Sequence, residues 1–140
     1  PKPADVIRQL GGTTADQSQL AWAKVVEAVR HVGTYQSVAF DAPIIHRAVA
    51  DLGGWIWLGA QTDKEWPFVE RRFRDTYRAY LHRGLAGAEA PARLVGHFEA
   101  VNAARGYAVE PPVLIGDKAR AALVAGAQPP RLEAAEEAKR

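Results

Sequence analysis

The sequence predicts an all-α fold: a compact orthogonal array or bundle of about six helices with extended, proline-containing loops. Apolar side chains recur at spacings of three and four along most of the chain, which is the helical period. Prolines precede these stripes and glycines follow them, where each residue typically starts or stops a helix. The 140 residues, 48% hydrophobic and 24% charged, match one globular domain, which we place at residues 1–126.

The first part of the chain contains two expected helices and one expected loop. A short helix covers residues 3–10, with Pro3 in its first turn and a glycine pair after its end. A longer helix covers residues 14–32. Its apolar stripe consists of Trp22, Val25, Val26, Val29 and Val32. Residues 34–40 (TYQSVAF) are strand-like, but we expect a loop because an isolated strand has nothing to pair with.

The next two helices are expected to follow without a long connection. Asp41 is the expected N-cap, and Pro43 the first-turn residue, of a helix that ends before the glycines at residues 53–54. Residues 55–59 are apolar on almost all sides, which predicts a short buried helix.

A further helix is expected to end at Arg83. It starts either with a capping box, in which Thr62 is followed three residues later by Glu65, or at Pro67 itself. The side chains expected to face the core are Val69, Phe73, Tyr77 and Tyr80.

The sequence of the C-terminal third predicts two helices that flank an extended segment. The first covers residues 91–106. Its inward side chains are expected to be Leu94, Val95, Phe98 and Val101. Residues 107–116 must be extended around their two prolines. Asp117 is expected to cap a last helix, and residues 127–140 form a charged tail with no apolar stripe, which we expect to be frayed and solvated.

Composition excludes several classes of protein. The absence of cysteine excludes disulfides and thiolate zinc sites. No apolar run approaches the ~20 residues that span a bilayer, so we expect no membrane partner and a cytoplasmic location. The formal net charge of +2 permits a nucleic-acid partner without arguing for one. Because the chain lacks methionine even at position 1, we expect it to be the C-terminal part of a longer natural protein.

Signals for catalysis are absent from the sequence. No glycine-rich loop ends in the lysine and serine or threonine that bind phosphates. The four histidines lack paired-ligand spacings, and His46 and Asp51 would lie on different helix faces. Ser18 and Ser37 lack the histidine and acid that a nucleophile needs. We therefore expect no enzyme, no metal and no cofactor, and we do not expect a small-molecule ligand.

The most distinctive surface feature is a row of basic residues on the helix that ends at Arg83. Spacings of three and four would align Arg71, Arg74, Arg78 and His82, with Arg72 and Arg83 nearby. The row is either a solvated face with local pairs, such as Glu70–Arg74 and Asp75–Arg78, or a contact for nucleic acid or an acidic protein surface.

Three tryptophans offer a second candidate surface. Trp55, Trp57 and Trp66 are either core residues, which their apolar context favours, or stacking platforms for bases. If one of them is exposed, we expect it to be Trp57.

The motifs also resemble a known family in their order along the chain. PKPADVIRQL comes first, followed by FDAPIIHRAVADLGGW, EWPFVERRFRDTYRAYLHRG and EPPVLIGD. This combination resembles an uncharacterised family of phage and prophage proteins of Gram-negative bacteria, over most of the chain to about Gly126.

A more distant similarity is to phage proteins of the helicase-loader or replisome-organiser kind. Three positions correspond: a proline-x-proline junction at residues 1–3, a helix start at residues 41–43 and "GGW" at residues 53–55. The helix start of those phage proteins is "DP", whereas this chain has Asp41-Ala42-Pro43, with one alanine inserted. The resemblance implies a phage DNA-replication accessory protein that acts inside a bacterial host. It would be a non-ATPase adaptor that contacts the replicative helicase or another replication protein. It would also contact DNA through the arginine row. Two alternatives stay open: a structural or regulatory phage protein with protein partners only, and an enzyme whose active site lies elsewhere in the natural chain.

Overall fold

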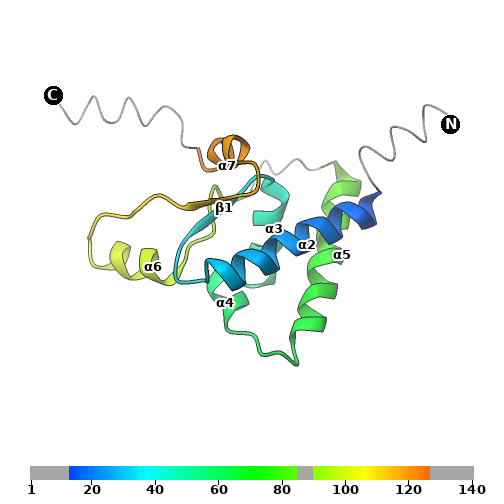
Figure 1. Cartoon of the computed structure of the whole chain (residues 1–140), viewed down its shortest axis with the longest axis horizontal. Coiled ribbons are helices and arrows are strands. Elements are labelled where there is room, and N and C mark those ends of the chain that lie inside the picture. The colour runs from blue at the N-terminus through cyan, green and yellow to red at the C-terminus, as the bar shows by residue number, and fades with distance from the viewer. Residues whose placement is uncertain (1–12, 85–89, 127–140) are drawn as a thin grey trace.

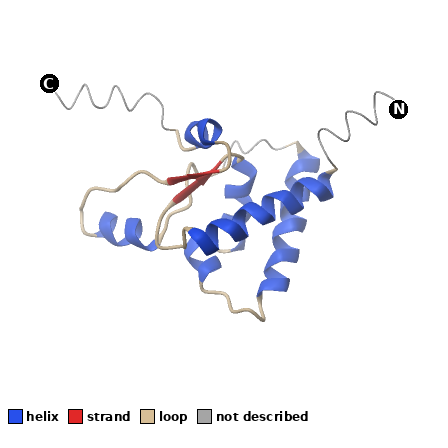
Figure 2. Cartoon of the chain, in the orientation of Figure 1, coloured by secondary structure: helices blue, strands red, loops and turns tan. Residues whose placement is uncertain are grey.

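The structure is a computed structural model that describes residues 13–84 and 90–126. Within these ranges the chain forms six helices and one two-stranded parallel sheet (Figures 1 and 2). The elements are α2 (Thr14–His31), β1 (Val38–Phe40), α3 (Pro43–Leu52), α4 (Trp55–Gly59), α5 (Trp66–Arg83), α6 (His97–Ala104), β2 (Val113–Ile115) and α7 (Lys118–Val124). The fold is therefore mostly helical, as predicted, but it is not purely α.

The core lies where α2, α3 and α5 pack together, with α4 and β1 beside them. The aromatic side chains at its centre are Trp22, Phe40, Trp55, Phe73 and Tyr77. Trp22 joins α2 to α5, because its ring lies 5.3 Å from the Phe73 ring. In the described parts of the chain, no helix is long and apolar enough to cross a membrane.

Most helices begin and end as the sequence predicts. The α2 helix starts with a capping box formed by Thr13 and Asp16. The α5 helix starts at Trp66 with Pro67 in its first turn, and it ends at Gly84, whose backbone is left-handed (φ 71°). Asp117 caps α7 by accepting a hydrogen bond from the Arg120 backbone N–H. The expected helix at residues 3–10 and the tail at 127–140 lie outside the described residues.

The loop predicted for residues 34–40 is wrong at its end, where β1 forms. Its partner β2 comes from the C-terminal segment, and the parallel register pairs Val38 with Val113 and Phe40 with Ile115. The other edge of β1 is partly covered too, because Val38 and Leu94 exchange both backbone hydrogen bonds, at 3.1 and 2.9 Å. The strand is thus not isolated, and all three of its residues are buried.

Asp41 does not cap α3, as had been expected. The N-cap is Ala42, with no side-chain cap, and Pro43 occupies the first turn. The Asp41 carboxylate instead binds Lys24 Nζ at 3.0 Å and accepts the Asp117 backbone N–H at 2.9 Å. Asp41 therefore ties the carboxyl ends of both strands to α2.

The helix predicted for residues 91–106 is also wrong in its first half. It starts only at His97, because the preceding backbone is drawn out to pair with β1. Gly96 lies so close to the segment before β1 that an added Cβ would be 2.6 Å from the carbonyl of Gln36. Leu94 is buried as predicted, but Val95, Phe98 and Val101 are exposed and do not point inward.

Candidate partner-binding surfaces

The arginine row lies on the outer side of α5. Val69, Phe73, Tyr77 and Tyr80 are buried as predicted, so the remaining circumference of the helix faces outward. Arg71, Arg72, His82 and Arg83 are exposed, and Arg74 and Arg78 are half-buried. At 100° per residue, the four positions from Arg71 to His82 lie within about 80°, or less than a quarter of a turn.

Local pairing neutralises only part of this row. Arg74 forms the predicted ion pair with Glu70, at 3.3 Å. The pair predicted between Asp75 and Arg78 does not form. Across residues 13–84 and 90–126, neither Arg71 nor Arg78 has an ion pair or a side-chain hydrogen bond. Glu70 offsets the charge of Arg74 alone, so the row keeps a net positive charge.

Two adjoining hollows run beside the arginines. The larger, of about 520 Å³, is lined by Trp22, Val26, Val29, Arg30, Asp63, Trp66, Pro67 and Glu70. The smaller, of about 250 Å³, is lined by Pro67, Glu70, Arg71, Arg74 and Asp75. Because they share Pro67 and Glu70, they form one depression along the edge between α2 and α5, which we call the α2–α5 groove.

Of the two tryptophans that line this groove, Trp66 is the more exposed, because Trp22 is buried in the core. The Trp66 ring lies 5.3 Å from that of Trp22, and it is half-buried. Trp55 is buried and donates its indole N–H to the Gln36 carbonyl at 3.0 Å. Trp57, the tryptophan expected at the surface, is only half-exposed and packs against the core. Trp57 and Trp66 both have intermediate exposure, and of these two Trp66 is the one that lines the α2–α5 groove.

The histidines lie apart from one another, and the described ranges contain no cluster of histidines and acids that could hold a metal. His46 is fully buried. Its Nε2 accepts the Phe40 backbone N–H at 2.8 Å, so the proton is on Nδ1, which faces the Pro91 carbonyl at 2.7 Å. Burial lowers the pKa of this imidazole, and the ring is therefore a neutral structural bridge. Asp51 does not contact it and instead accepts a hydrogen bond from Tyr80.

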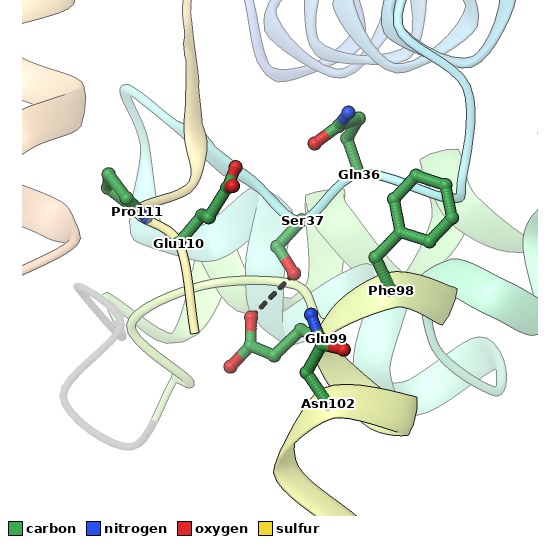
Figure 3. Close-up of a pocket in the computed structure, with 7 residues that line it drawn as sticks. All are labelled: Gln36, Ser37, Phe98, Glu99, Asn102, Glu110 and Pro111. Carbon is green, nitrogen blue, oxygen red and sulfur yellow. Dashed lines mark hydrogen bonds between the residues drawn. The ribbon is translucent and has the colours of Figure 1, made fainter. Parts of the chain in front are cut away.

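A polar pocket of about 230 Å³ lies beside α6, and sequence reasoning did not find it. Figure 3 shows its lining, which consists of Gln36, Ser37, Phe98, Glu99, Asn102, Glu110 and Pro111. At its base the Ser37 hydroxyl donates to Glu99 Oε1 at 2.5 Å and accepts the Gly96 backbone N–H at 2.9 Å. Arg93 also donates to Glu99, at 3.3 Å. We call this the Ser37 pocket.

The Ser37 hydroxyl is held by a carboxylate and a backbone amide, an arrangement that links the segment before β1 to α6. Its partners are Glu99 and Gly96, and no histidine hydrogen-bonds to it in the described parts of the structure. The other serine, Ser18, donates to the Ala15 carbonyl within its own helix, at 2.9 Å. Sequence reasoning missed Glu99 because its contact with Ser37 spans 62 residues.

These surfaces define a mostly helical module with a small parallel sheet, a row of arginines beside a groove of mixed charge, and a polar pocket. The chain belongs to the family described as Domain of unknown function (DUF6475), whose model matches residues 38–128. The match begins at β1 and includes α5, α6 and the sheet, whereas α2 precedes it. No curated protein and no solved structure matches the chain.

Proposed function

We propose that this chain is a non-catalytic adaptor in the DNA replication of a phage or prophage, where it contacts the replicative helicase and DNA in the cytoplasm of the bacterial host. The resemblance to helicase-loader and replisome-organiser proteins supports the class. The observation that carries the proposal is the outer side of α5, where Arg71 and Arg78 have no partner among the described residues. Guanidinium groups in such a row can bind phosphates through paired hydrogen bonds.

The α2–α5 groove gives this surface a second kind of contact. Trp66, which packs on the buried Trp22, offers aromatic surface next to Arg71 and Arg74. Aromatic rings beside basic side chains are the combination that single-stranded nucleic acid uses. They also suit a helicase segment with an apolar anchor and an acidic neighbour.

DNA binding is tested by fluorescence anisotropy with a 30-nucleotide single strand between 50 and 200 mM salt. We expect binding to weaken with salt because phosphate contacts release counterions. Arg71→Glu/Arg78→Glu should abolish binding or lower the salt slope by about one per lost contact. The matched control, Arg105→Glu/Arg120→Glu, reverses two exposed arginines outside α5 and should leave the slope unchanged.

The helicase contact is tested by co-purification of the full chain with the replicative helicase of its source. The α5 double variant should lose the helicase, and the control variant should retain it. Equal retention by both variants, or no helicase with the wild-type chain, would contradict the proposal.

The second candidate function, a structural or regulatory phage protein with protein partners only, is favoured by the acids of the groove. Asp63, Glu70 and Asp75 line the same hollows as the arginines, and carboxylates repel a phosphate backbone. A mixed surface of this kind fits a protein that carries charges of both signs. Salt-independent or absent DNA binding, together with loss of a protein partner in the α5 variant, would select this candidate.

A further inference from the structure

The α6 helix presents apolar side chains to the outside. It contains no buried residue, and its Phe98 and Val101 are 53% and 47% exposed. Tyr35, itself 58% exposed, packs against Phe98 with ring centroids 5.4 Å apart and stacks on His97 at 4.5 Å. These four residues define the α6 patch. Contiguous exposed apolar side chains of this kind mark interaction sites.

The Ser37 pocket adjoins this patch, because Phe98 belongs to both. Figure 3 shows Gln36, Asn102, Glu110 and Phe98 around its opening. The only charged residues of its lining are Glu99 and Glu110, both acids.

One of these two carboxylates lacks a counter-ion. Arg93 pairs with Glu99 at 3.3 Å, but it reaches Glu110 only at the backbone carbonyl, at 3.4 Å. The Glu110 carboxylate has no ion pair across residues 13–84 and 90–126. The pocket therefore keeps a negative charge beside an exposed aromatic ring.

We propose that the α6 patch and the Ser37 pocket together dock a protein segment that carries an arginine or lysine flanked by apolar residues. The cation enters the pocket toward Glu110 and the carboxamide oxygens of Gln36 and Asn102, with its stem along the Phe98 ring. The flanking apolar residues cover Tyr35 and Val101. A volume of about 230 Å³ is below the ~300 Å³ at which pockets for small molecules begin, so it suits a single side chain.

This surface is additional to the arginine row and opposite to it in charge. Figure 1 shows α6 and α5 at opposite ends of the long axis of the molecule. A partner on one surface therefore leaves the other accessible. The chain could then hold a basic segment of one protein while an acidic partner or nucleic acid occupies α5.

The first test selects a phage-displayed library of random 12-residue peptides against the immobilised full chain. We expect enrichment of sequences with arginine or lysine within two positions of an apolar residue. Phe98→Ser/Glu110→Gln should lose this enrichment. Leu123→Ser/Glu27→Gln removes an exposed apolar side chain and an exposed carboxylate elsewhere and should keep it. Because all four side chains are exposed, both variants should melt cooperatively at the wild-type temperature.

The second test titrates the ¹⁵N-labelled full chain with one enriched peptide and with its arginine-to-glutamine form. The arginine peptide should shift the amides of Gly96, Phe98 and Asn102, and the glutamine form should bind at least ten-fold more weakly. Three results would overturn the proposal. These are no enrichment, equal affinity of the two peptides, and occupation of the patch by this chain itself. Occupation would be seen as cross-relaxation between Phe98 and residues 127–140, or as a dimer that Phe98→Ser dissociates.

Discussion

His46 offers the sharpest test of how this fold is held together. The imidazole joins α3 to β1 through the Phe40 N–H at 2.8 Å and to the chain before α6 through the Pro91 carbonyl at 2.7 Å. A protonated ring would present an N–H to the N–H of Phe40, in addition to losing its solvation. The folded state therefore selects the neutral ring, and its pKa is lowered by burial.

The consequence for stability has a defined direction. The unfolded chain takes up the proton near pH 6.5, whereas the folded chain does so only at lower pH. The contribution of the neutral ring is therefore complete above pH 6.5 and is lost as the pH falls from there to the folded pKa. The loss approaches about 1.4 kcal/mol per pH unit between the unfolded and the folded pKa.

His46→Gln separates this effect from general acid sensitivity. Glutamine does not titrate, and it leaves at least one of the two backbone partners unsatisfied, which costs about 1–3 kcal/mol at pH 7.5. Urea unfolding, followed by tryptophan fluorescence at pH 7.5, 6 and 5, should show the wild-type advantage shrinking as the pH falls. His31→Gln, at an exposed position, should follow the wild-type curve. A wild-type advantage that stays constant within 0.5 kcal/mol would refute the reasoning.

Three further substitutions test the joints of the small sheet, each by urea or thermal unfolding. Asp41→Asn should cost about 1–3 kcal/mol because it weakens the contact with Lys24. Burial raises the pKa of Asp41, but its hydrogen bonds outweigh this and lower it, so the difference between variant and wild type should fade below pH 3.8. Gly116→Ala should lower the free energy of unfolding by about 1–3 kcal/mol because the Gly116 backbone is left-handed (φ 88°). It should lower it further because the added Cβ clashes with Asp41. The control Gly126→Ala should show only the backbone cost, since Gly126 is also left-handed but has no atom near its Cβ position. Gly96→Ala should lower the melting temperature and also change the amide signals of α6, and unchanged signals would contradict the close approach of Gly96 to the backbone of Tyr35 and Gln36.

Local signals predicted the helices well. The α2 and α5 helices have apolar side chains at the helical spacing and recognisable ends, and both properties depend on neighbours within four residues. Pro43, Pro67 and Asp117 act where a first-turn proline or an N-cap is expected. Such features can be recognised in sequence because their physical cause lies within one or two turns.

The sheet could not be predicted in this way because its stability depends on distant partners. Residues 38–40 are strand-like on their own, and only residues 113–115 and Leu94 decide that they pair. The same limit applies to Asp41, whose side chain binds a backbone amide 76 residues away.

The candidate surfaces were predictable to different degrees. Helical spacing alone predicts that Arg71, Arg74 and Arg78 share a face, and it predicted one of the two expected ion pairs. The exposed position of Phe98 could not be predicted, since an apolar residue at helical spacing gives the same sequence pattern whether it faces its own core or another protein. The Ser37 pocket could not be predicted from the sequence because its residues come from three separate segments.

The late arrival of β2 has a consequence for how the chain folds during synthesis. Until residues 113–115 leave the ribosome, β1 is an apolar strand with an unpaired edge, the kind of segment that recruits other chains. Closing so long a loop is also slow, because its entropy must be lost before the short ladder forms. We therefore expect truncation before residue 113 to give an aggregating product even though the α2, α3 and α5 sequences are intact, and we expect the yield of native protein to depend on how quickly the last segment is made.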